Sequence, residues 1–261
     1  MGDPQVSDSD SVLARVLADE AGDLLLRLRK DAGSEPEDVT SLRASGDAGA
    51  NDLLLRRLAQ ERPDDAVLSE EAQDDRVRLR ARRVWIVDPL DGTREFGEPP
   101  RDDWAVHVAL WQDGDLTAGA VARPAAGTTY ATDDPPKAPT GEPQRIRLAV
   151  SRSRPPAFVT ALADRLGAEL VPMGSAGVKA SSVWDGSSDA YLHAGGQYEW
   201  DSAAPVAVAR AAGLHTSRID GSPLAYNRPD PLLPDLLICR PEIAERLLVA
   251  IADLTTEETG T

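Results

Sequence analysis

The chain of 261 residues has few of the residue types that build several common protein sites. It has a single cysteine, Cys239, so an intramolecular disulfide cannot form and a zinc site made of cysteines is excluded. Its three histidines, His107, His193 and His215, are not spaced as metal ligands. A metal site would therefore be built from oxygen ligands, and these favour Mg²⁺ or Mn²⁺ over Zn²⁺.

Basic residues and long apolar runs are scarce as well. Against 44 aspartates and glutamates there are 28 lysines and arginines, so the formal net charge is −16. This charge argues against broad binding of nucleic-acid polymers or anionic membranes. No apolar run approaches the ~20 residues that cross a bilayer. The N-terminus also lacks the basic and apolar parts of a signal peptide, so we expect a cytoplasmic protein.

The residue types that are present, and their spacing, predict a folded protein in which helices and strands alternate. Hydrophobic residues make up 41% of the chain, enough for a sizeable core. Leucines at helical spacing predict helices over 7–30 and 50–62. The polar, glycine-rich stretch 31–50 between them is expected to be a loop or mobile flap. Apolar runs on either side of Asp113-Gly114 predict a hairpin.

A domain boundary is predicted in the proline-rich segment 133–144, which contains four prolines. It divides the chain into an N-terminal domain, 1–143, and a C-terminal domain, 144–261. In the second part, strand and helix patterns alternate up to the C-terminus.

Residues 83–96, RVWIVDPLDGTREF, carry most of the chemistry. An apolar run typical of a buried strand leads into Asp88-Pro89-Leu90-Asp91-Gly92-Thr93. Pro89 restricts the backbone, Gly92 relieves it, and Thr93 is a good helix N-cap. Such a turn presents two carboxylates and a hydroxyl beside free N–H groups, which together can hold Mg²⁺ and a phosphate. Asp-Pro and Asp-Gly also occur in ordinary turns, so this interpretation needs further acids.

Further acids lie at the predicted ends of other elements. Glu70 follows a predicted strand at 66–69, and Asp201 and Asp52 lie near predicted helix starts. Element ends project side chains from a rigid frame, as active sites require. Taken singly, Glu70 could be a solvated acid, and Asp201 and Asp52 could be helix caps.

Three separated motifs together match one family. Glu70-Glu71 follows an apolar strand, DPLDGT occupies 88–93, and Trp200-Asp201 comes about 110 residues later. In this order and spacing, the chain resembles the Mg²⁺-dependent, lithium-sensitive superfamily of inositol monophosphatase and fructose-1,6-bisphosphatase. The resemblance implies an α/β (α+β) fold, a layered αβαβα sandwich. Its N-terminal sheet would be mixed and largely antiparallel, its C-terminal α/β domain smaller, and the protein a homodimer.

Further markers resemble the 3′-phosphoadenosine 5′-phosphate phosphatase branch of this superfamily. They are Arg94-Glu95-Phe96, Glu199 before Trp200-Asp201, and Leu224-Ala225-Tyr226-Asn227. The resemblance implies a phosphatase of sulfur assimilation that converts this nucleotide, and its 5′-phosphosulfate relative, to AMP or adenosine 5′-phosphosulfate. Inositol 1-phosphate and fructose 1,6-bisphosphate remain open as alternative substrates.

The resemblance also implies roles for individual residues. Two or three Mg²⁺ ions, replaceable by Mn²⁺, would be bound by Glu70, Asp88, Asp91, Asp201 and the Leu90 carbonyl. The attacking water would be oriented and deprotonated by Asp52 and Thr93, with Glu70 beside them. The substrate and its phosphate would contact Asp91, Gly92, Thr93, Gly174, Ser175 and Asp201.

The chain departs from the family pattern between Arg43 and Asp52. The family usually has a lysine, a Ser-Pro stretch and a threonine before the acid that we equate with Asp52. Here Arg43 is a candidate replacement for the lysine, and Asp47 rivals Asp52 as the partner of Thr93.

Two other classes of function compete with this prediction. Haloacid-dehalogenase phosphatases end a strand with Asp-x-Asp, whereas Asp88 and Asp91 are three residues apart with Pro89 between them. That spacing does not allow the nucleophile and acid of that class, so no phospho-aspartate is expected. A non-catalytic acidic protein that binds metal for structure is the second alternative.

Overall fold

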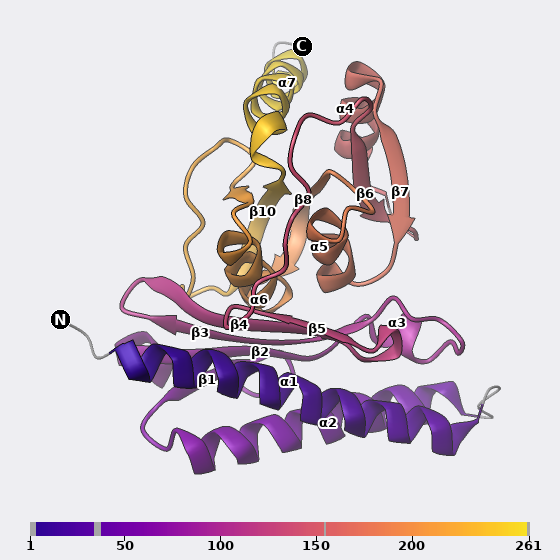
Figure 1. Ribbon diagram of the computed structural model, residues 1–261. Coiled ribbons are helices and arrows are strands. Elements are labelled where there is room, and N and C mark those ends of the chain that lie inside the picture. Colours follow the sequence, from indigo (N-terminus) through magenta and orange to yellow (C-terminus); the bar gives the residue numbers. More distant parts are fainter. Residues whose placement is uncertain (1–3, 34–37, 154, 260–261) are drawn as a thin grey trace.

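The computed structural model describes residues 4–33, 38–153 and 155–259, which form five layers (Figure 1). Two long helices, α1 (Pro4–Ala32) and α2 (Val39–Glu61), form the first layer. They cover a five-stranded sheet. Its strands in spatial order are β1 (Ala66–Ser69), β2 (Arg83–Asp91), β3 (Ala105–Gln112), β4 (Asp115–Arg123) and β5 (Thr128–Ala131). Only β1 and β2 pair in parallel within this sheet, so the predicted mixed, largely antiparallel sheet is confirmed.

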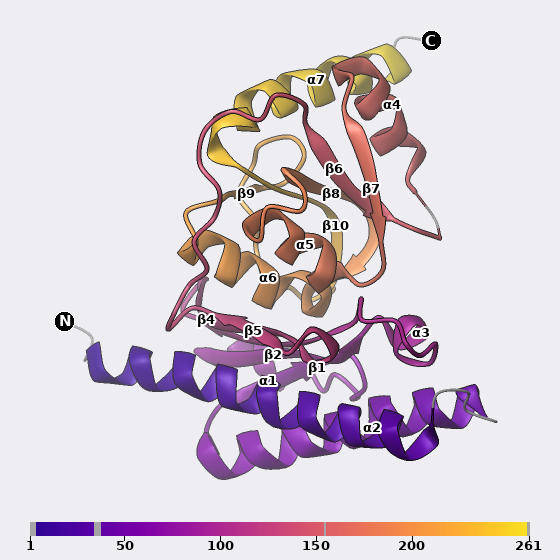
Figure 2. The same ribbon diagram turned by 45° about the vertical axis from the view of Figure 1, so that its right-hand side comes forward.

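The middle layer is formed by α5 (Ala176–Trp184) and α6 (Glu199–Ala211), between the first sheet and a second one. The second sheet has the order β7 (Glu169–Met173), β6 (Arg147–Ser151), β8 (Ala190–Tyr198), β10 (Leu232–Cys239) and β9 (His215–Ser217). Its far face is covered by α4 (Ala157–Leu166) and α7 (Pro241–Thr259), as Figure 2 shows. The predicted αβαβα sandwich is therefore confirmed.

Strand β2 shows why the central sequence is apolar at successive positions. Trp85 and Val87 pack toward α1 and α2, whereas Val84 and Ile86 pack toward α6. A strand covered on both faces needs no polar alternation. The last four residues of this buried strand, which include Asp88 and Asp91, are therefore held between the helices on either side of the sheet.

The predicted loop or flap over 31–50 is wrong for residues 39–50, which belong to α2. Asp38 caps this helix by accepting a hydrogen bond from the Ser41 N–H at 2.9 Å. Gly46, which suggested a loop, lies where α2 passes close to Phe96: a Cβ on Gly46 would lie 2.8 Å from its ring. The loop prediction is also wrong for residues 31 and 32, which end α1, and residues 34–37 lie outside the described residues.

The predicted hairpin, β3 and β4, is confirmed around Asp113-Gly114. The division into 1–143 and 144–261 stays a prediction, and its boundary falls in the irregular segment between β5 and β6. Short 3₁₀ helices occupy Val77–Arg80 and Pro124–Ala126. Among the described residues, no helix has both the length and the apolar character needed to cross a membrane.

Candidate active site

The end of β2 supplies the two carboxylates of the DPLDGT string. Asp88 is 1% exposed and Asp91 is 7% exposed, and the pairing of β2 with β3 is irregular between them. The chain then turns at Gly92, whose φ of +88° is in the left-handed region. Gly92, rather than Thr93, is the N-cap of the short helix α3 (Thr93–Phe96). Thr93 is therefore the first residue of that helix, and its hydroxyl is available for other contacts.

Asp201 joins these two acids from the first turn of α6. Asp88, Asp91 and Asp201 each offer a carboxylate oxygen, and these atoms all lie within 4.8 Å of one another. Glu70, directly after β1, adds a fourth carboxylate that contacts Asp88. The structure thus brings together acids that are far apart in the sequence, as the motif pattern predicted.

The electrostatics of this cluster favour a cation. Burial, and then the charges on its neighbours, raise the pKa of Asp88 well above its usual range. Burial and Asp91 raise the pKa of Asp201 to about 6, and burial and Asp201 raise that of Glu70 to about 7. Carboxylates this close oppose each other's ionisation, and a divalent ion among them would compensate their charge. An all-oxygen set of this kind fits a hard cation.

Asp91 is held more tightly than the other acids. It accepts hydrogen bonds from the Ser175 hydroxyl and from the N–H groups of Ala176 (2.9 Å) and Gly177 (2.6 Å), at the start of α5. The His107 Nε2 atom lies 3.2 Å from its Oδ2 atom. Burial alone would raise the pKa of Asp91, but His107, Lys179 and Ser175 together outweigh burial and the pKa is lowered. Asp91 is therefore an ionised carboxylate with a fixed orientation.

Thr93 pairs with Asp47 and not with Asp52. The Thr93 hydroxyl lies 3.2 Å from the Asp47 Oδ1 atom and 3.1 Å from the Leu90 carbonyl oxygen. Asp52 is exposed and lies five residues further along α2, roughly 140° around the helix axis. Burial, and then the charge on Glu71, raise the pKa of Asp47 to about 6. The predicted pairing of Asp52 with Thr93 is wrong, because α2 turns Asp47 toward this site instead.

A cavity of about 570 Å³ adjoins the acid cluster. Of the predicted substrate-binding residues, those that line it are Asp91, Gly92, Gly174, Ser175 and Asp201. Thr93, the remaining one, faces Asp47. Its wall also includes Arg94 and His193. Tyr226, from the marker Leu224-Ala225-Tyr226-Asn227, is a core residue whose hydroxyl lies 3.2 Å from that of Ser202.

The markers around Glu199 have a structural explanation. Its carboxylate accepts hydrogen bonds from the N–H groups of Asn227 and Arg228, both at 2.7 Å. The Asn227 side chain in turn accepts a hydrogen bond from Arg78 at 2.8 Å. Glu199 thereby fixes the start of α6, and with it the position of Asp201 two residues later.

The comparisons with known proteins agree with this geometry. The sequence model of the inositol monophosphatase family matches residues 8–256. The chain belongs to the inositol monophosphatase family. Within this family it is similar to the 3′-phosphoadenosine 5′-phosphate phosphatase of Mycobacterium bovis, at 57% identity over 242 residues and 90% of each chain.

More distant members of the family include enzymes named CysQ. The 3′(2′),5′-bisphosphate nucleotidase CysQ of Escherichia coli is 31% identical over 226 residues, 80% of this chain and 91% of its own. The crystal structure of CysQ from Bacteroides thetaiotaomicron matches at a TM-score of 0.75 and 26% identity. That match covers 89% of this chain and 97% of the other. The family and branch that the motifs suggested are confirmed by these similarities.

The sequence did not reveal three residues that support the site. His107 is fully buried and lies against Asp91. Asp103 accepts a hydrogen bond from Gly174, which with Ser175 forms the corner before α5. Lys179 donates hydrogen bonds to the carbonyls of Ser175 and Gly174 from inside the core. The only signals in the sequence were a histidine in the middle of a strand and a lysine in an apolar helix. Neither signal indicates which residue the side chain contacts.

Proposed function

We propose that this chain is a metal-dependent phosphomonoesterase acting on 3′-phosphoadenosine 5′-phosphate. It would release phosphate and AMP, and would convert the related 5′-phosphosulfate to adenosine 5′-phosphosulfate. The observation that carries the proposal is the meeting of Asp88, Asp91 and Asp201 beside a cavity. The names of the Mycobacterium and Escherichia relatives support the choice of substrate.

The proposed cofactor is Mg²⁺, as two or three ions that Mn²⁺ could replace. Glu70, Asp88, Asp91 and Asp201 would hold the ions, together with the Leu90 carbonyl. Bound there, the cation supplies Lewis-acid stabilisation of phosphate charge and makes water more acidic. The fixed orientation of Asp91 helps because it spares the site a reorganisation when charge develops.

Asp47 and Thr93 are the proposed proton-handling pair, in place of the expected Asp52. The Thr93 hydroxyl can donate one proton at a time, to Asp47 or to the Leu90 carbonyl. While it donates to Asp47, its lone pairs can accept a hydrogen bond from a water on the side of the acids. Asp47 can thus take up a proton through Thr93, as a general base must.

The cavity would hold the nucleotide, and its volume lies in the range of small-molecule sites. The substrate phosphate would contact the turn at Gly92 and Thr93 and the corner at Gly174 and Ser175, next to Asp91 and Asp201. The net charge of −16 makes such local contacts, and not a general field, responsible for binding an anion.

A phosphate-release panel tests the proposal. The purified protein is assayed with Mg²⁺ on 3′-phosphoadenosine 5′-phosphate, its 5′-phosphosulfate relative, inositol 1-phosphate and fructose 1,6-bisphosphate, each with and without Li⁺. We expect the nucleotides to be hydrolysed with the highest kcat/KM, and Li⁺ to inhibit. Rapid turnover of inositol 1-phosphate with none of the nucleotides would refute the substrate assignment. No turnover of any of them would favour a non-catalytic metal-binding protein.

A homodimer and a cytoplasmic location are also proposed, on the strength of the family resemblance. Light scattering of the purified protein tests the first, since a mass near the 27.8 kDa of one chain would contradict a dimer.

A further inference from the structure

The corner that precedes α5 has a strained backbone. Ser175 has a φ of +48° and a ψ of 141°, a conformation that residues with a side chain rarely adopt. Such a conformation is strained and persists only where surrounding contacts enforce it. Ser175 and the next two residues donate the hydrogen bonds that fix Asp91. The strained corner is therefore part of what orients this acid.

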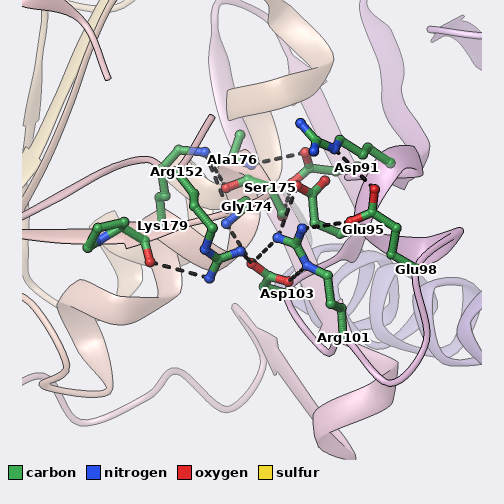
Figure 3. A network of polar contacts seen from close by, with 12 residues as sticks. Asp91, Glu95, Glu98, Arg101, Asp103, Arg152, Gly174, Ser175, Ala176 and Lys179 are labelled. Carbon is green, nitrogen blue, oxygen red and sulfur yellow. Dashed lines mark hydrogen bonds and ion pairs between the residues drawn. The ribbon is translucent and has the colours of Figure 1, made fainter. Parts of the chain in front are cut away.

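Asp103, which precedes a strand of the first sheet, holds the backbone of this corner in place. It lies just before β3 and is 6% exposed, and its Oδ2 atom accepts the Gly174 N–H at 2.7 Å. The same oxygen accepts hydrogen bonds from Arg101 at 2.9 Å and from Arg152 at 2.5 Å, while Oδ1 accepts a second one from Arg101. Figure 3 shows the Asp103 carboxylate between the two guanidinium groups, beside Gly174.

Because the corner is closely packed, the position of Asp103 affects the position of Asp91. A Cβ on Gly174 would lie 2.6 Å from Glu95 and 2.9 Å from the Asp103 carbonyl oxygen, so the corner has no room on that side. Arg101 also contacts Glu95, at 3.1 Å, and joins this wall to the same network. A shift of the corner would displace all three donors on Asp91 together.

We infer that Asp103 is a positioning residue that fixes the Gly174-Ser175 corner and thereby the orientation of Asp91. Because Arg152 lines the cavity and Asp91 belongs to the acid cluster, Asp103 also couples the cavity wall to that cluster. This inference rests on the proposed function for its effect on turnover, but its effect on metal binding can be measured without substrate.

The test compares Asp103→Asn with a matched control, Asp189→Asn. Asp189 likewise accepts hydrogen bonds from two arginines and one backbone N–H, but it lies directly before β8, outside the cavity lining. The control therefore loses the same kind of contacts away from the site. For each variant we would measure Mn²⁺ binding by electron paramagnetic resonance, kcat and KM for 3′-phosphoadenosine 5′-phosphate, and thermal unfolding.

We expect Asp103→Asn to lower kcat and Mn²⁺ affinity by about 10-fold to 100-fold, as loss of a residue that orients a metal ligand typically does. KM should change less, and Asp189→Asn should keep the wild-type kcat and Mn²⁺ affinity. If Asp103→Asn does not fold, Arg101→Met replaces it. Arg101 holds Asp103 without lining the cavity, so its loss should weaken Mn²⁺ binding in the same direction.

Wild-type Mn²⁺ affinity and kcat in a folded Asp103→Asn protein would overturn the inference. Where that variant does not fold, the same result for Arg101→Met would overturn it. If the wild type does not hydrolyse the nucleotide, the proposed function fails, yet Mn²⁺ binding still decides the role of Asp103.

Discussion

At the scale of single residues, the pairing of Thr93 with Asp47 decides how the site could activate water. The 3.2 Å contact between the Thr93 hydroxyl and Asp47 joins α3 to α2 across 46 residues of sequence. Asp52 lies on another side of α2 and is exposed. The family resemblance suggested Asp52, and the departure of this chain from the family pattern made Asp47 a rival; the structure pairs Thr93 with Asp47.

Replacing each acid by its amide separates the two assignments. We expect Asp47→Asn to lower kcat by about 10²-fold or more, the usual contribution of a general base. Asp52→Asn should leave kcat unchanged, because its side chain is exposed to solvent. Steady-state phosphate release measures both, and a larger loss in Asp52→Asn than in Asp47→Asn would contradict the assignment.

The limits of sequence reasoning are also clearest at single residues. Asp88 and Asp91 could be predicted because both stand in one short string whose turn chemistry is local. Asp103 and Lys179 could not, since a lone charged residue carries no sign of its partner. Asp103 meets Gly174 across 71 residues, and only the fold creates that contact.

At the scale of elements, α2 shows that a glycine-rich stretch can be a packed helix. Gly46 lies against Phe96 and Leu90, both buried beneath α2. Gly49, one turn later, faces only the ends of Leu24 and Leu28, at 3.3 Å and 3.9 Å from a Cβ in its place. Composition alone predicts a loop for such a stretch, because it does not distinguish glycines needed for contact from glycines needed for turns.

The two glycines should respond differently to alanine. Gly46→Ala overpacks α2 against Phe96, so we expect a loss of about 1–3 kcal/mol in unfolding free energy. It should also lower kcat, because Asp47 is the next residue. Gly49→Ala should be neutral or stabilising by up to about 1 kcal/mol, since alanine favours helix. Urea unfolding measures both, and equal stability of the two variants would contradict the close contact of α2.

The second sheet is held together at one end by Asp189. This residue is fully buried and joins Arg147 of β6 to Arg240, which follows β10. Burial alone would raise the pKa of Asp189, but the hydrogen bonds from Arg147 and then Arg240 lower it. Because the folded-state pKa lies below the unfolded one, the ionised form stabilises the fold.

This contribution should depend on pH in a defined direction. It is fully present above the unfolded pKa of about 3.9 and is lost as the pH falls through the lowered folded value. At pH 7 we expect Asp189→Asn to cost about 3 kcal/mol, as breaking a buried ion pair does. The gap to wild type in unfolding free energy should narrow below about pH 4. If the difference in unfolding free energy between wild type and Asp189→Asn stayed constant as the pH fell below about 4, that result would contradict this role of Asp189.

At the scale of the whole molecule, the acid cluster lies where the end of β2 in the first sheet meets the start of α6 in the middle layer. Asp88 and Asp91 end a strand of the first sheet, and Asp201 opens α6 in the layer between the sheets (Figure 1). The layered fold could be predicted because the motifs identify the family. The strand β9 and the extent of α2 could not, since a three-residue edge strand and a polar helix have weak local patterns.

The central claim is that these carboxylates bind a divalent cation that phosphate release requires. The most direct measurement is release of phosphate from 3′-phosphoadenosine 5′-phosphate by wild type and Asp91→Asn, across Mg²⁺ concentrations and after EDTA treatment. We expect wild-type activity to vanish with EDTA and return with Mg²⁺. Folded Asp91→Asn should be slower by about 10³-fold or more at any Mg²⁺ concentration, since a metal ligand is lost. Equal release by the two proteins, or wild-type release that EDTA does not affect, would contradict the account.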